Sequence, residues 1–332
     1  MLKQKILVVS DSLRDLPPAV AALAGCGHDI EYIDGLIGFS EIAASRLGDL
    51  AGADAIVMGR VMNIDAHALS FAPRARVIAL HTSGSDNVDL AEATRRGITV
   101  TSVKGVNAEQ CAEFSIGLML AVTRQIVTGD RAIRAGRWAA DTQSSFDLYG
   151  ATLSILGLGM IGKAAVHRAA AFGMKILVHT RTPDLAFGER YGIEYVGMAE
   201  ALARADVVSI YASLSDTTRH MIGARELALM QPHAYLINIA RGELIDEDAL
   251  FEALASRQIA GAGLDVFAVE PLHASRLFDL PNVVLTPHQA GLARSAKTNA
   301  AVRAVHNALS VLAGQLPADA VNPAAFTSGT NQ

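Results

Sequence analysis

Charged and titratable side chains follow several short apolar runs in the second half of the chain. Arg241 comes directly after YLINIA, and His288 ends the segment VVLTPH. Between them, Asp265 lies in GAGLDVF and Glu270 follows in the next loop. A cation, two acids and an imidazole could together hold a carboxylate and move a proton. Plainer alternatives exist, since Asp265 could cap a turn, Glu270 could belong to a surface turn and His288 is one of ten histidines.

A glycine-rich turn provides a candidate nucleotide site. Gly157-x-Gly159-x-x-Gly162 follows a predicted strand and opens a predicted helix, with Met160 and Ile161 between the last two glycines. In this context the first glycine permits a tight turn, the second lets the backbone approach a pyrophosphate, and the third lets helix and strand pack closely. The helix N-terminus would offer N–H groups to the phosphates. The alternative is a glycine turn without a ligand.

The next predicted strand, KILVH, bears on the choice of cofactor. An Asp or Glu commonly stands about 20 residues after the glycines and binds the ribose 2′-hydroxyl of NAD. This sequence has Thr180-Arg181-Thr182 there instead. A guanidinium pairs with a 2′-phosphate through charge-assisted hydrogen bonds, and the two hydroxyls can donate more. The segment therefore predicts NADP, with NAD possible if Arg181 is only a solvated loop residue.

The elements that position these residues alternate between β-branched runs and helical patterns, which predicts an α/β fold with parallel sheets. Ligands of such sheets bind outside the carboxyl ends of the strands, so Arg241, Asp265 and His288 would share an edge with the glycine turn. We expect two doubly wound sheets, the first flavodoxin-like and the second of the dinucleotide-binding type. Their strands are expected at residues 5–10, 28–33, 54–59, 76–81 and 98–103, and then at 151–159, 174–180, 206–214, 234–240, 259–267 and 282–288.

Helical patterns fill the remaining segments. Residues 107–136 predict one long helix that Asn107 and Gln110 would cap. Ser40 is the expected N-cap of an earlier helix. A last helix near 292–313 could return to cover the first sheet, because five strands are few to bury both faces. The long helix would bury a face made of Cys111, Phe114, Leu118 and Val122.

Whole-chain properties limit the function. The chain has 332 residues, of which 51% are hydrophobic, and this predicts two globular domains, at 1–102 with 293–332 and at 103–292. The net charge of −5 leaves no basic footprint for nucleic acid. No run of about 18 apolar residues predicts a membrane span. Cys26 and Cys111 have neither metal-binding nor disulfide spacing, so we expect a cytoplasmic protein without a metal site.

Taken together, the motifs resemble those of the D-2-hydroxyacid dehydrogenase family. The matching segments occur in the family's order along essentially the whole chain, as GSDNVDLAEATRRGITV, GLGMIG, NIARGELIDEDAL, GLDVFAVEP and LTPHQAG. The resemblance implies a flavodoxin-like substrate domain, an inserted Rossmann domain, a cleft between them, a nicotinamide cofactor and a homodimer.

The resemblance also implies roles for single residues. Arg241 would bind the substrate carboxylate, His288 would act as acid and base, and Glu270 would orient His288. Asp265 would hold the nicotinamide end of the cofactor. The backbone at Ser83 and Gly84 would meet the substrate carboxylate. The cofactor-binding residues expected in all are Gly157, Gly159, Met160, Ile161, Gly162, Thr180, Arg181, Thr182, Ser213, Thr218, Ala240, Asp265 and Cys111.

Departures from the family pattern refine the prediction. Thr180 replaces the acid common in NAD-dependent members, and Ser213 replaces a proline and could reach the adenosine 2′-phosphate side. We therefore expect an NADP-preferring reductase of a small 2-oxoacid, of the glyoxylate or hydroxypyruvate type. One alternative is an NAD-linked phosphoglycerate-type dehydrogenase, in which Arg60 could contact a distal phosphate. Another is a nucleotide-sensing protein like the family's corepressors. Glu270 argues against a formate dehydrogenase, which has glutamine there.

Overall fold

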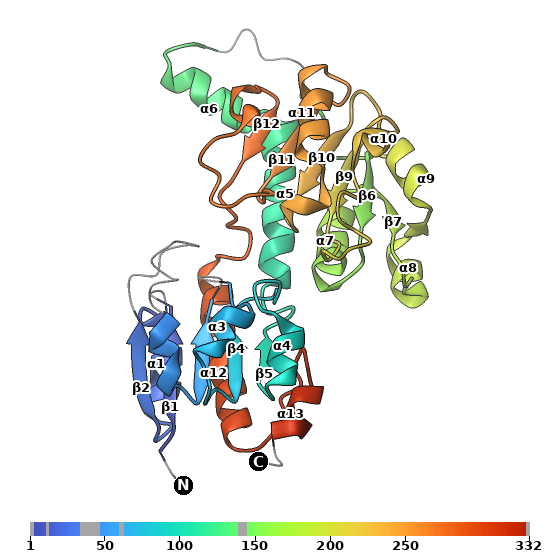
Figure 1. Ribbon diagram of the computed structural model, residues 1–332. Helices are drawn as coiled ribbons and strands as arrows, with labels where there is room; N and C mark the ends of the chain where they lie inside the picture. Colours follow the sequence, from blue (N-terminus) through green and yellow to red (C-terminus); the bar gives the residue numbers. More distant parts are fainter. Residues whose placement is uncertain (1–2, 11–12, 34–46, 60–62, 139–144, 330–332) are drawn as a thin grey trace. The chain divides into compact units, whose positions relative to one another are not determined.

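The computed structural model describes residues 3–10, 13–33, 47–59, 63–138 and 145–329 (Figure 1). The chain divides into two compact units. The first comprises residues 1–107 and 293–332, and the second comprises residues 108–292. We describe each unit by itself.

The first unit contains a five-stranded parallel sheet with the strand order β2-β1-β3-β4-β5, which is the flavodoxin-like order. Because helices cover both faces of such a sheet, its strands are nearly continuous apolar runs, such as AIVM and VIAL. The predicted parallel sheet is confirmed. The strands are β1 (Lys5–Val9), β2 (Asp29–Ile33), β3 (Ala55–Met58), β4 (Val77–Leu80) and β5 (Thr99–Ser102).

One helix from the far end of the chain packs on this sheet, as the sequence predicted. Helix α12 (Arg294–Leu312) contacts β3, β4 and β5 as well as α1 (Pro17–Ala24). Its buried face consists largely of small residues, among them Ala300, Ala301 and Ala304, which let helix and sheet approach closely. The predicted cap Ser40 lies outside the described residues. The other helices of the unit are η2 (Leu47–Gly52), α3 (Ala66–Ser70), α4 (Leu90–Arg95) and α13 (Ala324–Gly329).

The segment after α12 covers the edge strand β5. The N–H of Ser102 donates to the carbonyl of Asp319 at 3.1 Å, and the N–H of Val321 donates to the carbonyl of Val100 at 2.9 Å. The buried Asn322 side chain accepts a hydrogen bond from the N–H of Val100 at 2.7 Å and donates one to the carbonyl of Ile98 at 3.0 Å. Backbone groups that an open edge would expose are thereby paired.

The second unit contains a seven-stranded parallel sheet with the order β12-β11-β10-β9-β6-β7-β8, which is a Rossmann-type sheet. The order reverses between β6 and β9, where a dinucleotide crosses such a sheet. The predicted fold class is confirmed, although β8 was not foreseen because it has only two residues, both of them accessible. The strands are β6 (Thr152–Leu156), β7 (Lys175–His179), β8 (Glu194–Tyr195), β9 (Val207–Ile210), β10 (Tyr235–Asn238), β11 (Gly261–Leu264) and β12 (Val283–Leu285).

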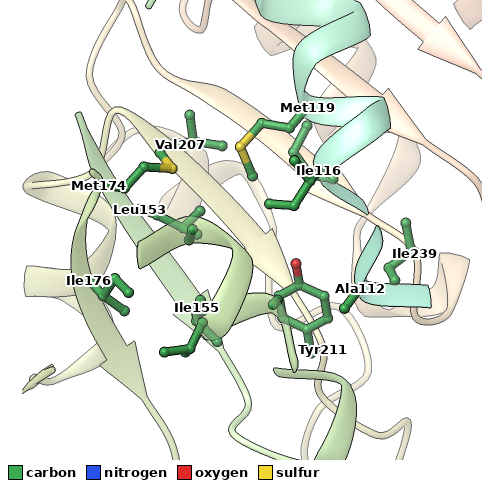
Figure 2. Packing of buried hydrophobic residues seen from close by; sticks show 14 of the residues in the cluster. Ala112, Ile116, Met119, Leu153, Ile155, Met174, Ile176, Val207, Tyr211 and Ile239 are labelled. Carbon is green, nitrogen blue, oxygen red and sulfur yellow. The ribbon is translucent and has the colours of Figure 1, made fainter. Parts of the chain in front are cut away.

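Helices α5 and α7 supply much of the core on one face of this sheet. In Figure 2, Ile116 and Met119 of α5 lie near Leu153 of β6 and Tyr211. The buried hydroxyls of Tyr211 and Ser115 are 2.7 Å apart, so the polar end of Tyr211 is satisfied inside the core. The helices of the unit are α5 (Ala108–Thr123), α6 (Ile126–Arg134), α7 (Met160–Ala171), α8 (Leu185–Tyr191), α9 (Met198–Ala203), α10 (Ala224–Leu227) and α11 (Glu247–Ala255), with the short turns η3 (Gly242–Leu244) and η4 (Arg276–Asp279).

The prediction of one continuous helix over 107–136 is wrong, because α5 and α6 are separate and bent by 60°. The break occurs at Gln125, which adopts a left-handed conformation with φ of 54°. The carbonyl of Thr123 accepts a hydrogen bond from the N–H of Phe146 at 3.0 Å, an acceptor that a continuing helix would use itself. The predicted buried face of α5 is confirmed, with Cys111, Leu118 and Val122 buried. No residue of α6 is buried.

No single helix in the described part of the chain is long and apolar enough to cross a membrane. Only α5 and α6 taken together, as a bent pair, have the length and apolar composition for one.

Candidate active site

The three glycines of the turn after β6 meet three different physical requirements. Gly157 has φ of 100°, and a Cβ there would lie 2.8 Å from the backbone nitrogen of Ala212. A Cβ on Gly162 would lie 2.4 Å from the carbonyl oxygen of Gly157, so only glycine lets α7 pack against the turn. Gly159 precedes α7 and faces open space. The open position is the one expected to lie against a pyrophosphate, so the turn fits a dinucleotide.

The neighbouring loops carry the remaining predicted contacts to the nucleotide. Arg181 and Thr182 are exposed after β7, and within the described residues no carboxylate pairs with Arg181. Met160 is exposed, whereas Ile161 packs partly against the core. Ser213 is exposed after β9, and Thr218 closes this loop, since its Oγ1 donates to the carbonyl of Ser213 at 2.8 Å.

A buried asparagine holds the turn that presents Arg241. The side chain of Asn238, at the end of β10, donates to the carbonyl of Arg241 at 2.8 Å. Its amide oxygen accepts from the N–H of Ala240 at 3.0 Å. The guanidinium of Arg241 folds back, with Nη1 donating to the carbonyl of Ala240 at 2.7 Å. The half-buried Arg241 thus stands on a turn that Asn238 fixes from below, a role that was not predicted from the sequence.

Gly242 brings two functional loops into direct contact. A Cβ at this position would lie 1.9 Å from the carbonyl carbon of Phe267, so no other residue fits there without separating the backbones. The turn of Arg241 therefore lies against the loop that leads from Asp265 to Glu270. A glycine directly after the arginine, in NIARGEL, was the available sequence signal for this contact.

Glu270 and His288 form a hydrogen-bonded pair. Glu270 Oε2 lies 2.7 Å from His288 Nδ1, and Glu270 Oε1 accepts from the N–H of Phe267 at 3.0 Å. A carboxylate only accepts hydrogen bonds, so Nδ1 carries the proton of this contact. The other ring nitrogen, Nε2, is then the one that can exchange a proton with a bound molecule. The side chain of His288 is 36% exposed and that of Glu270 is 20% exposed.

Asp265 holds the turn that carries His288. Its Oδ1 accepts from Thr286 Oγ1 at 2.6 Å and from the N–H of Gln289 at 2.9 Å, while Oδ2 accepts from the N–H of Ala290 at 2.9 Å. The N–H of His288 donates to the carbonyl of Asp265 at 2.8 Å. This anchoring keeps His288 in a left-handed conformation with φ of 49°, which few residues other than glycine adopt.

Cys111, in the first turn of α5, belongs to the same neighbourhood. Burial raises the pKa of its thiol to about 11, the charge of nearby Asp265 raises it further, and Arg241 opposes the shift. The thiol therefore stays protonated, and Cys111 is suited to packing rather than to nucleophilic chemistry. Arg241, Asp265, Glu270 and His288 are brought together with it at one edge of the second sheet.

The residues expected to meet the substrate from the first unit follow β4. Ser83 Oγ donates to Asn107 Oδ1 at 2.8 Å, and Thr82 Oγ1 donates to the carbonyl of Gly84 at 2.9 Å. The adjacent His81 was not predicted. Its Nε2 lies 3.1 Å from Ser10 Oγ, and desolvation lowers the pKa of the ring to about 4, so this imidazole is neutral. Arg60 lies outside the described residues.

Comparison with known proteins identifies the family. The family model described as D-isomer specific 2-hydroxyacid dehydrogenase, NAD binding domain, matches residues 116–290. The glyoxylate reductase of Thermococcus litoralis is 40% identical over 282 residues, which cover 83% of this chain and 85% of that protein.

Solved structures agree in fold over nearly the whole chain. A glyoxylate reductase from Paecilomyes thermophila has a TM-score of 0.84 and 31% identity, covering 97% of this chain and 99% of its own. The D-lactate dehydrogenase of Aquifex aeolicus, solved with NAD and lactic acid, has a TM-score of 0.85 and 25% identity, covering 96% and 99%. The relationship predicted from the motifs is confirmed: this chain belongs to the D-isomer specific 2-hydroxyacid dehydrogenases and is a dehydrogenase dependent on a nicotinamide dinucleotide.

Proposed function

We propose that this protein is an NADP-preferring reductase of a small 2-oxoacid, with glyoxylate or hydroxypyruvate as the leading substrates. The observation that carries the proposal is the 2.7 Å contact between Glu270 and His288, beside the turn of Arg241. It provides a proton donor and a carboxylate binder at the edge of the sheet where the dinucleotide turn lies. Related proteins named glyoxylate reductase support the choice of substrate.

The reaction requires three groups to act on one substrate. When bound, the reduced cofactor supplies the hydride. Arg241 would pair with the carboxylate of the oxoacid and so fix the direction of its carbonyl, helped by backbone N–H groups at Ser83 and Gly84. As negative charge develops on the carbonyl oxygen, His288 Nε2–H would donate to it and then transfer its proton. In the reverse direction the neutral imidazole would accept the proton of the hydroxyl.

The proposed division of labour follows the two units. The first unit would bind the oxoacid and the second would bind the cofactor through Gly157, Gly159 and Gly162. The exposed Thr180-Arg181-Thr182 segment after β7 supports the preference for NADP, because a cation and two hydroxyls suit a 2′-phosphate. Asp265 would contribute at the nicotinamide end through the turn that it anchors, near Cys111 and Ala240. Ser213 and Thr218 would border the adenosine side.

A homodimer in the cytoplasm is the proposed working form. The observation that supports a second copy is the apolar surface of α6 and the segment after it. Ile126 is 56% exposed, Ile133 is 54% exposed and Trp138 is 90% exposed. An amphipathic helix that buries none of its own residues is suited to pairing with the same surface of another copy.

The experiment that tests the proposal is a panel of 2-oxoacids assayed with NADPH and NADH in parallel. We expect glyoxylate or hydroxypyruvate with NADPH to give the highest kcat/KM. Oxidation of phosphoglycerate with NAD at a higher kcat/KM would support the phosphoglycerate-type alternative instead. Tight binding of a dinucleotide without turnover of any oxoacid would support a nucleotide-sensing protein, and would overturn the proposal.

A further inference from the structure

An ion pair joins the glycine-turn helix to the loop that carries Arg181. Lys163, one residue after Gly162 in α7, places its Nζ 2.5 Å from Oδ2 of Asp184. Asp184 is three residues after Arg181 and directly precedes α8. Helices α7 and α8 are neighbours in the second unit (Figure 1). This contact ties the two chain segments that frame the adenosine end of a dinucleotide in sheets of this type.

Asp184 is held in place by several other contacts. Its Oδ1 accepts a hydrogen bond from the N–H of Phe187 at 3.1 Å and so caps α8. Its carbonyl accepts from the hydroxyl of Tyr195 at 2.6 Å. Lys163 Nζ also lies 5.2 Å from the centre of the Phe187 ring. The carboxylate therefore cannot turn away from the Arg181 loop without losing the cap of α8.

A fixed carboxylate at this position is unfavourable for NADP. Three residues span at most about 11 Å, so Asp184 lies within roughly one Debye length of Arg181 at physiological ionic strength. Its negative charge would act against a 2′-phosphate bound by Arg181. The hydrogen bond from Lys163 is the main cause that holds the pKa of Asp184 below its ordinary value, so the acid remains charged and the charge must be compensated.

We propose that Lys163 determines cofactor specificity by neutralising Asp184, so that the Thr180-Arg181-Thr182 loop accepts a 2′-phosphate. The inference rests on the NADP preference proposed above and extends it from the loop to the helix of the glycine turn. Lys163 acts through Asp184 and is a positioning residue rather than a catalytic one. Stability does not explain the pair, since the side chains are 37% and 40% exposed and exposed pairs stabilise a fold only weakly.

The test compares two probes that differ only in the 2′-phosphate. Adenosine 2′,5′-bisphosphate and adenosine 5′-monophosphate are titrated into the purified full chain at low ionic strength, and calorimetry gives the ratio of their Kd values. Lys163→Met removes the compensating cation, and we expect it to weaken binding of the bisphosphate about fivefold with little effect on the monophosphate. Asp184→Asn keeps the cap oxygen and removes the charge, so it should tighten bisphosphate binding by a similar factor.

The double variant decides whether the two residues act as one unit. Lys163→Met with Asp184→Asn should return the Kd ratio close to that of the unaltered protein, because the net charge is then restored. Arg168→Met, which removes another α7 cation from its pair with Glu109, is the matched control and should leave the ratio unchanged. High salt should shrink all of the differences.

Two results would overturn the inference. An unchanged Kd ratio in both single variants would do so, and equal weakening of both probes by Lys163→Met would assign Lys163 to the 5′-phosphates instead. Failure of the underlying NADP proposal would look different. The unaltered protein would then bind the two probes equally, and Arg181→Asp would not change their ratio or shift the preference toward NADH.

Discussion

Glu270 connects His288 to the backbone of its own loop: one carboxylate oxygen lies 2.7 Å from His288 Nδ1, and the other accepts from the N–H of Phe267. The imidazole is therefore oriented by a group that is itself oriented. We expect His288→Ala to lower kcat by about 10²- to 10⁴-fold with the Kd for NADPH nearly unchanged. Glu270→Gln keeps an acceptor for Nδ1 and should lose less activity than Glu270→Ala. Stopped-flow turnover and fluorescence titration with NADPH measure the two effects. An active His288→Ala variant would contradict the acid–base assignment.

Arg241 is expected to act through the substrate carboxylate. Arg241→Ala should mainly raise KM for the oxoacid, with a loss of about 2–5 kcal/mol of transition-state binding in kcat/KM. Arg241→Lys restores a charge but not the planar pair of donors, so it should recover only part of the loss. Steady-state kinetics over a range of oxoacid concentrations separates KM from kcat. A change confined to the KM for NADPH would assign Arg241 to the cofactor instead.

Asp265 anchors the turn of His288 with both carboxylate oxygens, and this gives it an effect on stability. Asp265→Asn would direct an amide N–H₂ at one of the N–H donors, which should lower the free energy of unfolding by about 1–3 kcal/mol and also reduce kcat. Asp246→Asn is a matched control, because the Asp246 side chain only caps α11 and asparagine caps equally well. Thermal unfolding and kcat are compared for the two variants. Weaker cofactor binding with unchanged stability and kcat would indicate that Asp265 acts on the nicotinamide alone.

Two glycines of the same turn should respond in opposite ways to alanine. At Gly159 a Cβ enters open space, so the fold should persist while NADPH binding weakens about tenfold or more, because the methyl group occupies the path of the pyrophosphate. At Gly162 a Cβ meets a carbonyl oxygen at 2.4 Å, and the free energy of unfolding should fall by about 1–3 kcal/mol. Thermal unfolding with and without NADPH distinguishes the variants. Full NADPH affinity in Gly159→Ala would remove this turn from the proposed site.

The exposed face of α6 predicts an effect on assembly. Ile133→Asp introduces a charge on this face and should shift the protein toward monomers in light scattering coupled to size-exclusion chromatography. Lys175→Asp makes a comparable charge change at an exposed residue of β7 and should leave the mass unchanged. A monomeric unaltered protein would contradict the homodimer directly.

Much of the architecture follows from short-range patterns. The apolar runs identified the strands because a parallel sheet buries both faces of each strand, and the glycine spacing identified the turn because Gly157 and Gly162 have no steric alternative. The small residues of the last predicted helix were consistent with its return to the first sheet. These features depend on residues that lie close together in the chain.

The features that were missed depend on distant partners. The helix over 107–136 breaks at Gln125 because Phe146 takes the carbonyl of Thr123, and no local signal announces that competitor. Asn238 and Gly242 shape the turn of Arg241 through contacts with segments that the chain reaches later or earlier. The hydrogen bonds of Asp265 to the 286–290 turn likewise require knowledge of which strands are neighbours.

The covering of the first sheet by α12 and the pairing of β5 with residues 319–322 have a consequence for biosynthesis. A ribosome delivers these segments only after the entire second unit, so the first five strands wait, with one face and one edge bare, while the inserted unit can already fold. During that interval the nascent protein exposes an apolar β-surface to which chaperones or other unfinished chains can adhere. Removing the final dozen or so residues would leave that edge permanently bare, even though those residues lie far from any chemistry.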